Sequence, residues 1–339
     1  MAVRVDIPGR QHTAVPGLGP KVDGPYDRCR MRFCRIGPRT YRRVTLAAAL
    51  SLAAITVTGG AVRLTGSGLG CPNWPTCEEG RIVAPLEYHA MVEFVNRMVT
   101  GAVSAAVIVA VAGSLLRTPR RADLVRLSLG LVAGMVGQIV LGGLVVLFHL
   151  SPLLVMGHFV VSMLLVWCAV VLHHRAGIPD GAAAAPVLDS SLMPLRRLVP
   201  AACSLVLLLG TVVTGSGPHP GSHDGQVVER LPFAIRDVAR LHAGAVWLFL
   251  ALVVTAAVLL VRARAPRHLL RRAELLAAAI VAQGTLGYVQ YFAGVPALLV
   301  GFHIAGAVAV WWAALTLSLG FYDTVPEPVP DRDPTLARI

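Results

Sequence analysis

Apolar residues form eight long stretches along the chain, separated by short polar segments. The stretches lie at 44–62, 90–114, 125–148, 152–173, 197–215, 238–261, 273–292 and 296–320. A helix needs roughly 20 predominantly apolar residues to cross the hydrocarbon core of a bilayer, and each stretch is close to that length or longer. The pattern therefore predicts an all-α polytopic membrane protein with eight transmembrane helices.

The composition excludes a pair of ordinary soluble domains. Of 339 residues, 55% are hydrophobic and 14% are charged, whereas soluble domains are typically about 25% charged. The net charge of +12 at pH 7 does not by itself indicate a nucleic-acid partner, because the arginines follow the predicted topology.

The basic residues predict the orientation in the membrane. If the spans alternate, 24 of the 30 Lys and Arg residues fall on the side of the two termini. The other six are Arg63, Arg81, Arg97, Arg230, Arg236 and Arg240. Because cytoplasmic loops are enriched in Lys and Arg, both termini are expected in the cytoplasm, with the chain in the cell membrane.

The second half of the sequence repeats the first. Gln138 begins the motif Gln-x-x-Leu-Gly and stands 20 residues before His158. Gln283 begins the same motif, again 20 residues before a histidine, His303. Thr-Gly-Ser-Gly at 65–68 also occurs once more, in the second half. Four spans return the chain to its starting side, so we expect two tandem pseudo-symmetric four-helix bundles.

The repeat predicts the domain boundaries. We expect a disordered basic cytoplasmic arm at 1–43, bundles at 44–174 and 197–320, a cytoplasmic linker at 175–196 and a disordered tail at 321–339. The arm lacks the apolar run and small-residue cleavage site of a signal peptide. A homo-oligomer is possible on this pattern but has no diagnostic motif.

Three of the eleven histidines lie well inside predicted spans, at the same depth from the outer face: His158, His242 and His303. His173 lies at the cytoplasmic end of its span. An ionisable residue within a span is costly and indicates function. His242 and His303 share one half, and two imidazoles facing each other across a bundle suit the axial positions of one heme b iron. The alternative is a pair of buried histidines bonded to backbone or hydroxyl groups.

The repeat assigns His242 a counterpart in the first half, and that residue is Asn96. Glu93 stands three residues earlier, where the second half has an alanine. Residues at i, i+3 and i+4 share a helix face, so Glu93, Asn96 and Arg97 are expected to point toward His158. One half would then bind a cofactor and the other would carry an active site. The alternative for Glu93 is an ion pair with Arg97.

Two further groups lie on the predicted outer side. Arg63, Arg97 and Arg240 are level with the intramembrane histidines and could bind heme propionates, although boundary arginines also extend toward water. His219 and His223 lie in the second large outer loop, and the sequence assigns them no role.

Cys71 and Cys77 lie in the outer segment GLGCPNWPTCEEG. The intervening Pro-Asn-Trp-Pro favours a tight reversal, and the outer side of a bacterial membrane is oxidising. A disulfide is therefore expected, with two free thiols or a thiolate site as the alternatives.

The segment GGAVRLTGSGLGCPNWPTC, followed by EFVNR, LGGLVVL, GHF, TGSG and RLHAGAVW, resembles the heme A synthase family over roughly residues 45–318. The resemblance implies an eight-helix enzyme of two similar halves. Such enzymes oxidise the C8 methyl group of heme O to a formyl group, giving heme A for terminal oxidases.

The resemblance also implies roles for individual residues. The positions of His242 and His303 match the family's heme b ligands, and that of His158 matches a ligand of the substrate, heme O. Glu93 matches the family acid, and the loop cysteines match the family's pair. The family motif has His where this chain has Asn96, so bis-histidine ligation in the first half is not expected.

We therefore expect a heme A synthase that uses heme b, with Glu93 stabilising charge or moving protons near the methyl group. Its partners would be heme O, the enzyme that makes heme O, the lipid bilayer and an electron donor for which the chain carries no motif. Two alternatives are a non-catalytic heme carrier for oxidase assembly and a transmembrane b-type cytochrome oxidoreductase. The latter would normally carry histidine pairs on both sides of the membrane.

Overall fold

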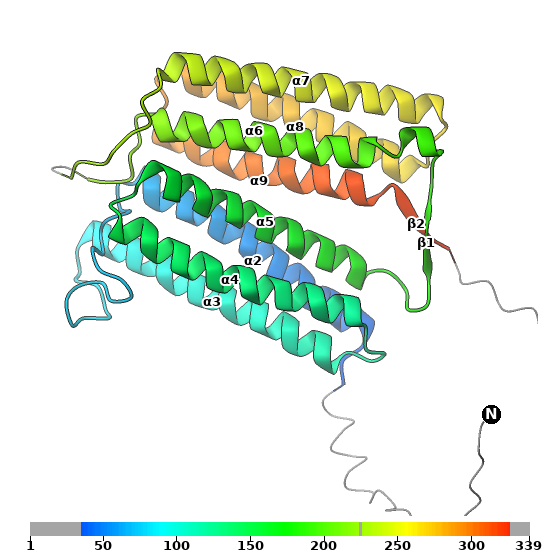
Figure 1. The fold of residues 1–339 in the computed structure, drawn as a ribbon, viewed down its shortest axis with the longest axis horizontal. Coiled ribbons are helices and arrows are strands. Elements are labelled where there is room, and N and C mark those ends of the chain that lie inside the picture. The colour runs from blue at the N-terminus through cyan, green and yellow to red at the C-terminus, as the bar shows by residue number, and fades with distance from the viewer. Residues whose placement is uncertain (1–34, 224–225, 326–339) are drawn as a thin grey trace, which may run out of the picture. The chain divides into compact units, whose positions relative to one another are not determined.

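The computed structural model describes residues 35–223 and 226–325. Within them, eight helices are long and apolar enough to cross a membrane, as predicted. They are α2 (Pro38–Leu64), α3 (Tyr88–Leu116), α4 (Ala122–Leu147), α5 (Pro152–Ala176), α6 (Leu195–Ser216), α7 (Ile235–Arg262), α8 (Arg267–Phe292) and α9 (Ala297–Leu319) (Figure 1). A short 3₁₀ helix, Ser190–Leu192, precedes α6.

Several helices extend beyond their apolar stretches. α2 begins at Pro38, so the last six residues assigned by sequence to the arm are helical, and α8 begins at Arg267 instead of 273. Hydropathy marks only the part of a helix that hydrocarbon surrounds, and arginines continue both helices past it. Proline at the start of α2 favours a helix there because its φ is already helical. Residues 1–34 of the predicted arm lie outside the described range.

Part of the predicted tail is ordered. β1 (Ala183–Pro186) in the linker pairs antiparallel with β2 (Tyr322–Val325), in the register Ala183 opposite Val325. The guanidinium of Arg196 lies 5.0 Å from the centre of the Tyr322 ring. Backbone pairing between segments so distant in sequence leaves no local hydropathy signal, which explains why the sequence predicted disorder here. Residues 326–339 lie outside the described range.

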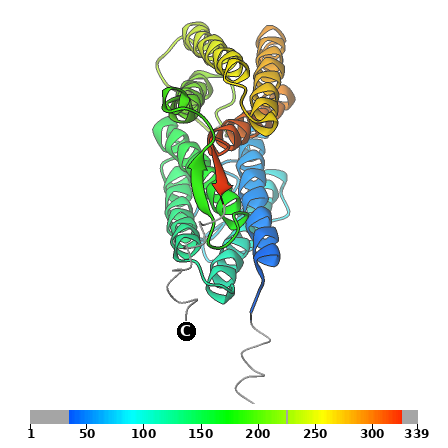
Figure 2. The same cartoon turned by 90° about the vertical axis from the view of Figure 1, so that its right-hand side faces the viewer.

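The two bundles repeat one packing arrangement. In the first, α2 packs on α3 and α5, and α4 packs on α3 and α5. In the second, α6 packs on α7 and α9, and α8 packs on α7 and α9. The halves meet through α2, α5, α6 and α9 (Figures 1 and 2). The predicted tandem pseudo-symmetric four-helix bundles are confirmed.

The buried core runs continuously through both halves. The indole N–H of Trp311 on α9 donates to the carbonyl of Met163 on α5 at 3.0 Å, which fixes the two central helices against each other. Large apolar side chains such as Leu153 and Leu248 are exposed on the outside of the bundles. Such a surface suits lipid, which needs no polar covering.

We call the end of the bundles that carries loops 65–87 and 217–234 the loop end, and the opposite end the termini end. At the loop end the two loops join the halves: Gly68 N–H donates to the Gly221 carbonyl at 2.7 Å. Gly66 has φ +69, and a Cβ there would lie 2.9 Å from the Ser222 carbonyl oxygen. Glycine is therefore required for this close approach.

The histidines of the second outer loop take part in this junction. His219 Nε2 lies 2.8 Å from the Val295 carbonyl oxygen. The ring of His223 stacks on that of His89, with centroids 4.4 Å apart, and His89 Nδ1 lies 2.9 Å from Ser67 Oγ. The His223 ring therefore contributes to the contact between the halves, whereas the His219 ring joins its loop to the turn before α9.

Candidate functional site

His242 on α7 and His303 on α9 face each other in the second half. Their ring centroids are 6.4 Å apart and the ring planes are inclined by 66°. A metal–imidazole bond is about 2 Å long, so an iron between two imidazoles would separate their centroids by about 6 Å. The spacing therefore fits two axial ligands of one heme. Among the described residues, no group of three or more His, Cys, Asp or Glu could hold a metal by itself.

A glycine on a neighbouring helix makes room for each intramembrane imidazole. A Cβ at Gly210 of α6 would lie 3.3 Å from Cε1 of His242, and one at Gly287 of α8 would lie 3.1 Å from Cε1 of His303. In the first half, a Cβ at Gly142 of α4 would lie 3.2 Å from Cε1 of His158. The three rings thus sit in positions that larger residues would crowd.

Two of these rings have a buried nitrogen that the protein leaves unsatisfied. Nδ1 of His158 and Nδ1 of His303 are buried and form no hydrogen bond with the described residues. Buried polar atoms usually have a partner, and those that lack one often mark sites that receive a further group. Both histidines are therefore suited to a site that receives a further group.

A repeated glutamine holds the backbone beneath two of the histidines. Gln138 Nε2 donates to the His158 carbonyl at 2.9 Å, and Gln283 Nε2 donates to the His303 carbonyl at 2.7 Å. The sequence pointed to these glutamines as a repeat but gave no role. The structure shows that they fix the helical turn that carries each histidine.

The first half differs where the second has His242. Asn96 Oδ1 accepts a hydrogen bond from Thr58 Oγ1 of α2 at 2.9 Å. The spacing of the Thr-Gly-Ser-Gly repeat pairs Gly210, the glycine that faces His242, with Ala61 of α2. The first half therefore has neither the second imidazole nor the glycine that would make room for it.

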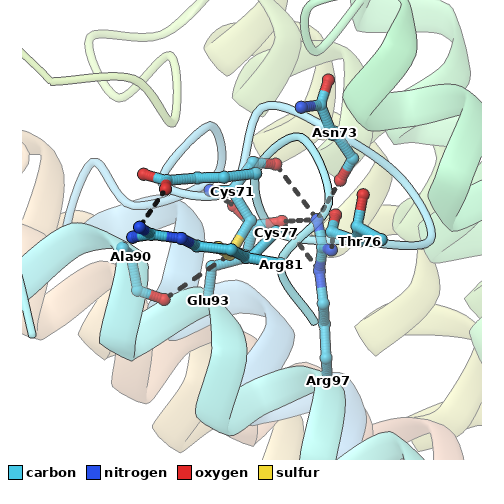
Figure 3. The surroundings of a disulfide bond; sticks show 9 residues. Cys71, Asn73, Thr76, Cys77, Arg81, Ala90, Glu93 and Arg97 are labelled. Atoms are coloured by element: carbon cyan, nitrogen blue, oxygen red, sulfur yellow. Dashed lines mark hydrogen bonds and ion pairs between the residues drawn. A yellow bond between two sulfur atoms is a disulfide. The ribbon is translucent and has the colours of Figure 1, made fainter. Parts of the chain in front are cut away.

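Glu93 and Arg97 face the loop between the cysteines, as Figure 3 shows. Glu93 Oε1 pairs with Arg97 Nη2 at 2.6 Å, and Glu93 Oε2 accepts from the Cys71 N–H at 2.8 Å. The ion pair considered from the sequence is present. The sequence predicted that Glu93, Asn96 and Arg97 point together. In the structure Glu93 and Arg97 contact the cysteine loop, whereas Asn96 bonds to Thr58 of α2.

Arg97 completes the attachment of this loop. It donates to the carbonyls of Cys71, Asn73 and Thr76 at 3.0–3.1 Å. Its hydrogen-bonding groups are therefore committed to the loop and to Glu93, which leaves little capacity for a heme propionate.

The predicted disulfide between Cys71 and Cys77 is confirmed, and both residues are buried. The loop that it closes reaches across to α4, since a Cβ at Gly143 would lie 2.7 Å from the Trp74 ring. Gly143 follows Gly142, the glycine beside His158. The disulfide loop therefore covers the first half at the loop end, close to its one intramembrane histidine.

Two arginines meet at the junction of the halves. Arg63 donates to the carbonyls of His219 at 3.0 Å and Thr214 at 3.1 Å. Arg230 donates to the same Thr214 carbonyl at 2.9 Å and to the Gly217 carbonyl. No carboxylate pairs with either arginine in the described part of the chain, and their charges repel each other. Burial lowers the pKa of Arg230.

Such a pair of cations is suited to an anion. The sequence pointed to Arg63 but not to Arg230, although Arg230 is one of only six basic residues on its side of the membrane. Arg240, the third sequence candidate for a propionate, is exposed, and within the described ranges it forms no hydrogen bond or ion pair.

Comparison with known proteins agrees with the histidine arrangement. No curated protein matches the sequence. Residues 42–316, which include all eight helices almost completely, match the protein family described as cytochrome oxidase assembly protein. The match implies a heme-related, heme A synthase-like role. The chain is thus a multi-pass membrane protein that belongs to the cytochrome oxidase assembly protein family, the heme A synthase family.

Proposed function

We propose that this protein converts heme O to heme A by oxidising the C8 methyl group. Two successive hydroxylations would give a gem-diol, which loses water to leave the formyl group. Each hydroxylation would consume one dioxygen, two electrons from the electron donor and two protons, place one oxygen atom on the methyl carbon and release the other as water. The observation that carries the proposal is the difference between the halves. The second has two facing imidazoles 6.4 Å apart, whereas the first has His158 alone, with Asn96 bonded to Thr58.

In the second half, His242 and His303 would hold heme b. Two imidazoles suit heme, because heme itself would supply the remaining ligands of its iron. When bound, heme b supplies one-electron transfer from a donor still to be identified. The glycines beside the two rings and the Gln283 bond to the His303 carbonyl keep the imidazoles in place before the heme arrives.

In the first half, His158 would be the protein ligand of the substrate. Asn96 is a weak ligand for iron, and Thr58 already occupies its carbonyl oxygen. One face of the bound heme O would then lack a strong protein ligand. A single ligand also favours turnover, because the product can leave after one bond to the protein breaks.

Glu93 would act near the reacting methyl group. Its side chain is 7% exposed and forms an ion pair with Arg97 at 2.6 Å. A fixed negative charge in a water-poor site stabilises positive charge that develops in the transition state. Through Cys71 it also holds the disulfide loop over the first half, so the two contributions need separate tests.

The proposal is tested by expressing the protein in cells that make heme O, extracting the hemes after purification and separating them by chromatography. Heme A or its hydroxylated intermediate beside heme b is the expected result. Heme b with unconverted heme O would contradict catalysis and favour a heme carrier. A second heme of b type, ligated near the termini end, would instead favour a transmembrane b-type cytochrome.

Glu93→Gln separates chemistry from loop attachment. Gln can still accept the Cys71 N–H, and Arg97 keeps its three loop carbonyls, so the loop should stay closed. We expect loss of heme A with heme b retained. The matched control is Cys71→Ser with Cys77→Ser, which opens the loop and keeps the carboxylate. If both changes give the same partial activity, Glu93 acts only through the loop.

Arg63 and Arg230, with Arg240, would bind the heme carboxylates. Esterifying both propionates of the added heme should weaken its binding to the natural protein. The ratio of the affinity for free heme to the affinity for the diester should be about tenfold smaller in Arg230→Gln, because one charge-assisted bond is lost. Arg236→Gln is the matched control, because it removes the same charge from the same side. An unchanged ratio in Arg230→Gln would exclude the pair from carboxylate binding.

The sidedness of the proposal is open to a direct test. The excess of arginines at the termini end supports cytoplasmic termini in the cell membrane. A cysteine placed in loop 217–234 should react with a membrane-impermeant thiol reagent in intact cells whose outer membrane has been made permeable. A cysteine in the linker should react only after lysis, and the reverse pattern would invert the orientation.

A further inference from the structure

A cavity of about 560 Å³ lies between the two halves within the membrane-spanning part of the protein. It is lined by residues of α2, α8 and α9, and α9 packs against both other helices, as Figure 2 shows. Ala54, Leu275 and Ala309 of its lining are exposed, so the cavity opens on the outside of the bundles. In a bilayer that surface faces lipid chains.

The cavity has the size and polarity of a site for an acyl chain. Apart from Arg272 and Thr316, its lining residues are apolar. If a methylene group occupies about 30 Å³, the volume of a water molecule in the liquid, the cavity has room for one chain of roughly 18 carbons. An open apolar cavity in hydrocarbon does not stay empty, so the question is which lipid it prefers.

Positive charge marks the termini end of the cavity. Arg272 donates through Nη1 to the Thr316 carbonyl at 2.9 Å, and both residues line the cavity. Arg42 on α2 and Arg272 on α8 both act electrostatically on His174 of α5. Cationic groups from both halves therefore lie within electrostatic range of one residue at the termini end of the cavity.

Acidic residues offset only part of this charge. Asp323 acts electrostatically on Arg272, and Asp123 pairs with Arg175 at 3.8 Å. Arg42 forms no ion pair in the described part of the chain. A net positive charge remains beside an apolar cavity, and that combination favours a lipid with an anionic headgroup.

We propose that this cavity binds one anionic glycerophospholipid from the leaflet at the termini end, which the arginine distribution predicts to be cytoplasmic. One acyl chain occupies the cavity, and the phosphate lies near Arg272. The lipid would then join the halves, because α2 belongs to the first and α8 and α9 belong to the second. The proposal is independent of the reaction that the protein catalyses.

The duplication provides an internal comparison. The repeat relates the three helices that line the cavity, α2, α8 and α9, to α6, α4 and α5. There Leu127 corresponds to Arg272, and Val160 and Leu164 correspond to Ala305 and Ala309. The related helices thus lack the arginine and carry larger side chains, so we expect one lipid per chain and not two.

The test uses the full chain, purified and delipidated in detergent, with native mass spectrometry after adding phosphatidylglycerol or phosphatidylcholine. We expect one retained phosphatidylglycerol, bound about fivefold more tightly than phosphatidylcholine, as one basic group near a membrane surface provides. Arg272→Gln should abolish this preference. Ala309→Phe should fill the cavity and abolish retention of either lipid.

Two controls match these variants. Arg271→Gln removes the same charge from the exposed neighbour of Arg272, and Leu164→Phe enlarges the related position on α5. Both should bind lipid as the natural protein does, and circular dichroism should show that all four variants are folded. Equal binding of both lipids, retention in Ala309→Phe, or a stoichiometric quinone displaced by Ala309→Phe would overturn the proposal.

Discussion

The two halves share a framework and differ in what it can hold. In both, a glutamine donates to the carbonyl of a histidine, and a glycine one turn after that glutamine faces the imidazole. The two glutamine–carbonyl hydrogen bonds differ in length by about 0.2 Å, which is within the scatter of hydrogen-bond lengths. The glutamine and the glycine that position an imidazole are therefore the same in each half, whereas the residue facing that imidazole is His242 in the second half and Asn96 at the corresponding position of the first.

At the site facing the shared histidine, the difference is concentrated at two neighbouring positions. The second half has His242 facing Gly210, and the first has Asn96 and Ala61. A lost ligand together with a filled gap would convert a closed heme site into one with an open face. Under the proposed function, duplication followed by change at these residues would separate a tightly held cofactor from a substrate that must leave.

The largest effect should come from removing the imidazoles one half at a time. His303→Ala should eliminate the b-type spectrum, because the remaining imidazole alone holds a heme weakly. His158→Ala should leave that spectrum intact and stop heme A formation. Heme content and the optical spectrum of each purified variant measure both outcomes. Loss of heme b in His158→Ala would mean that the halves are not separate sites.

The reverse experiment makes the first half resemble the second. Asn96→His with Ala61→Gly supplies the imidazole and the space that His242 and Gly210 provide in the second half. We expect two low-spin hemes per chain in place of one, with heme A output reduced because the open face is closed. Heme-to-protein stoichiometry and electron paramagnetic resonance report the result. Asn96→His alone is the control, and it should retain less heme than the double variant.

Much of this comparison could be predicted from the sequence, because spacing along a helix carries it. Eight spans, the duplication, the Cys71–Cys77 disulfide and the facing of His242 and His303 all follow from patterns within the chain. Helix ends were less accurate, because charged residues extend α2 and α8 past the hydrocarbon.

What the sequence could not predict depends on approaches between distant segments. Arg230 joins Arg63 only because the second loop crosses to the end of α2. Glu93 and Asn96 lie on the same face by helical spacing, yet one bonds to a loop and the other to α2. Strand β2 depends on a partner more than 130 residues away. No pattern within a single segment of the sequence predicts any of these contacts.

A smaller effect is expected from the glycines beside the rings. Gly287→Ala would place a Cβ 3.1 Å from the His303 ring, and crowding of this kind costs about 1–3 kcal/mol. We expect heme b affinity to fall by roughly tenfold. Gly142→Ala, with a matching 3.2 Å contact to His158, should leave heme b affinity unchanged and weaken heme O binding. Heme titration of each variant distinguishes the two, and a shared effect would show that the rings are coupled across the halves.

The smallest effect should come from the glutamines, and it should differ between the halves. Gln283→Met removes the side-chain bond to the His303 carbonyl, which is worth about 1 kcal/mol, or about fivefold in heme b affinity. In the first half the His158 carbonyl also accepts from Ser162 Oγ at 2.9 Å, and the residue corresponding to Ser162 in the second half is an alanine. Gln138→Met should therefore change heme O binding by less than fivefold, unless Ser162→Ala is made with it. Equal losses from the two single changes would mean that Ser162 does not support the carbonyl, and that the halves position their histidines identically.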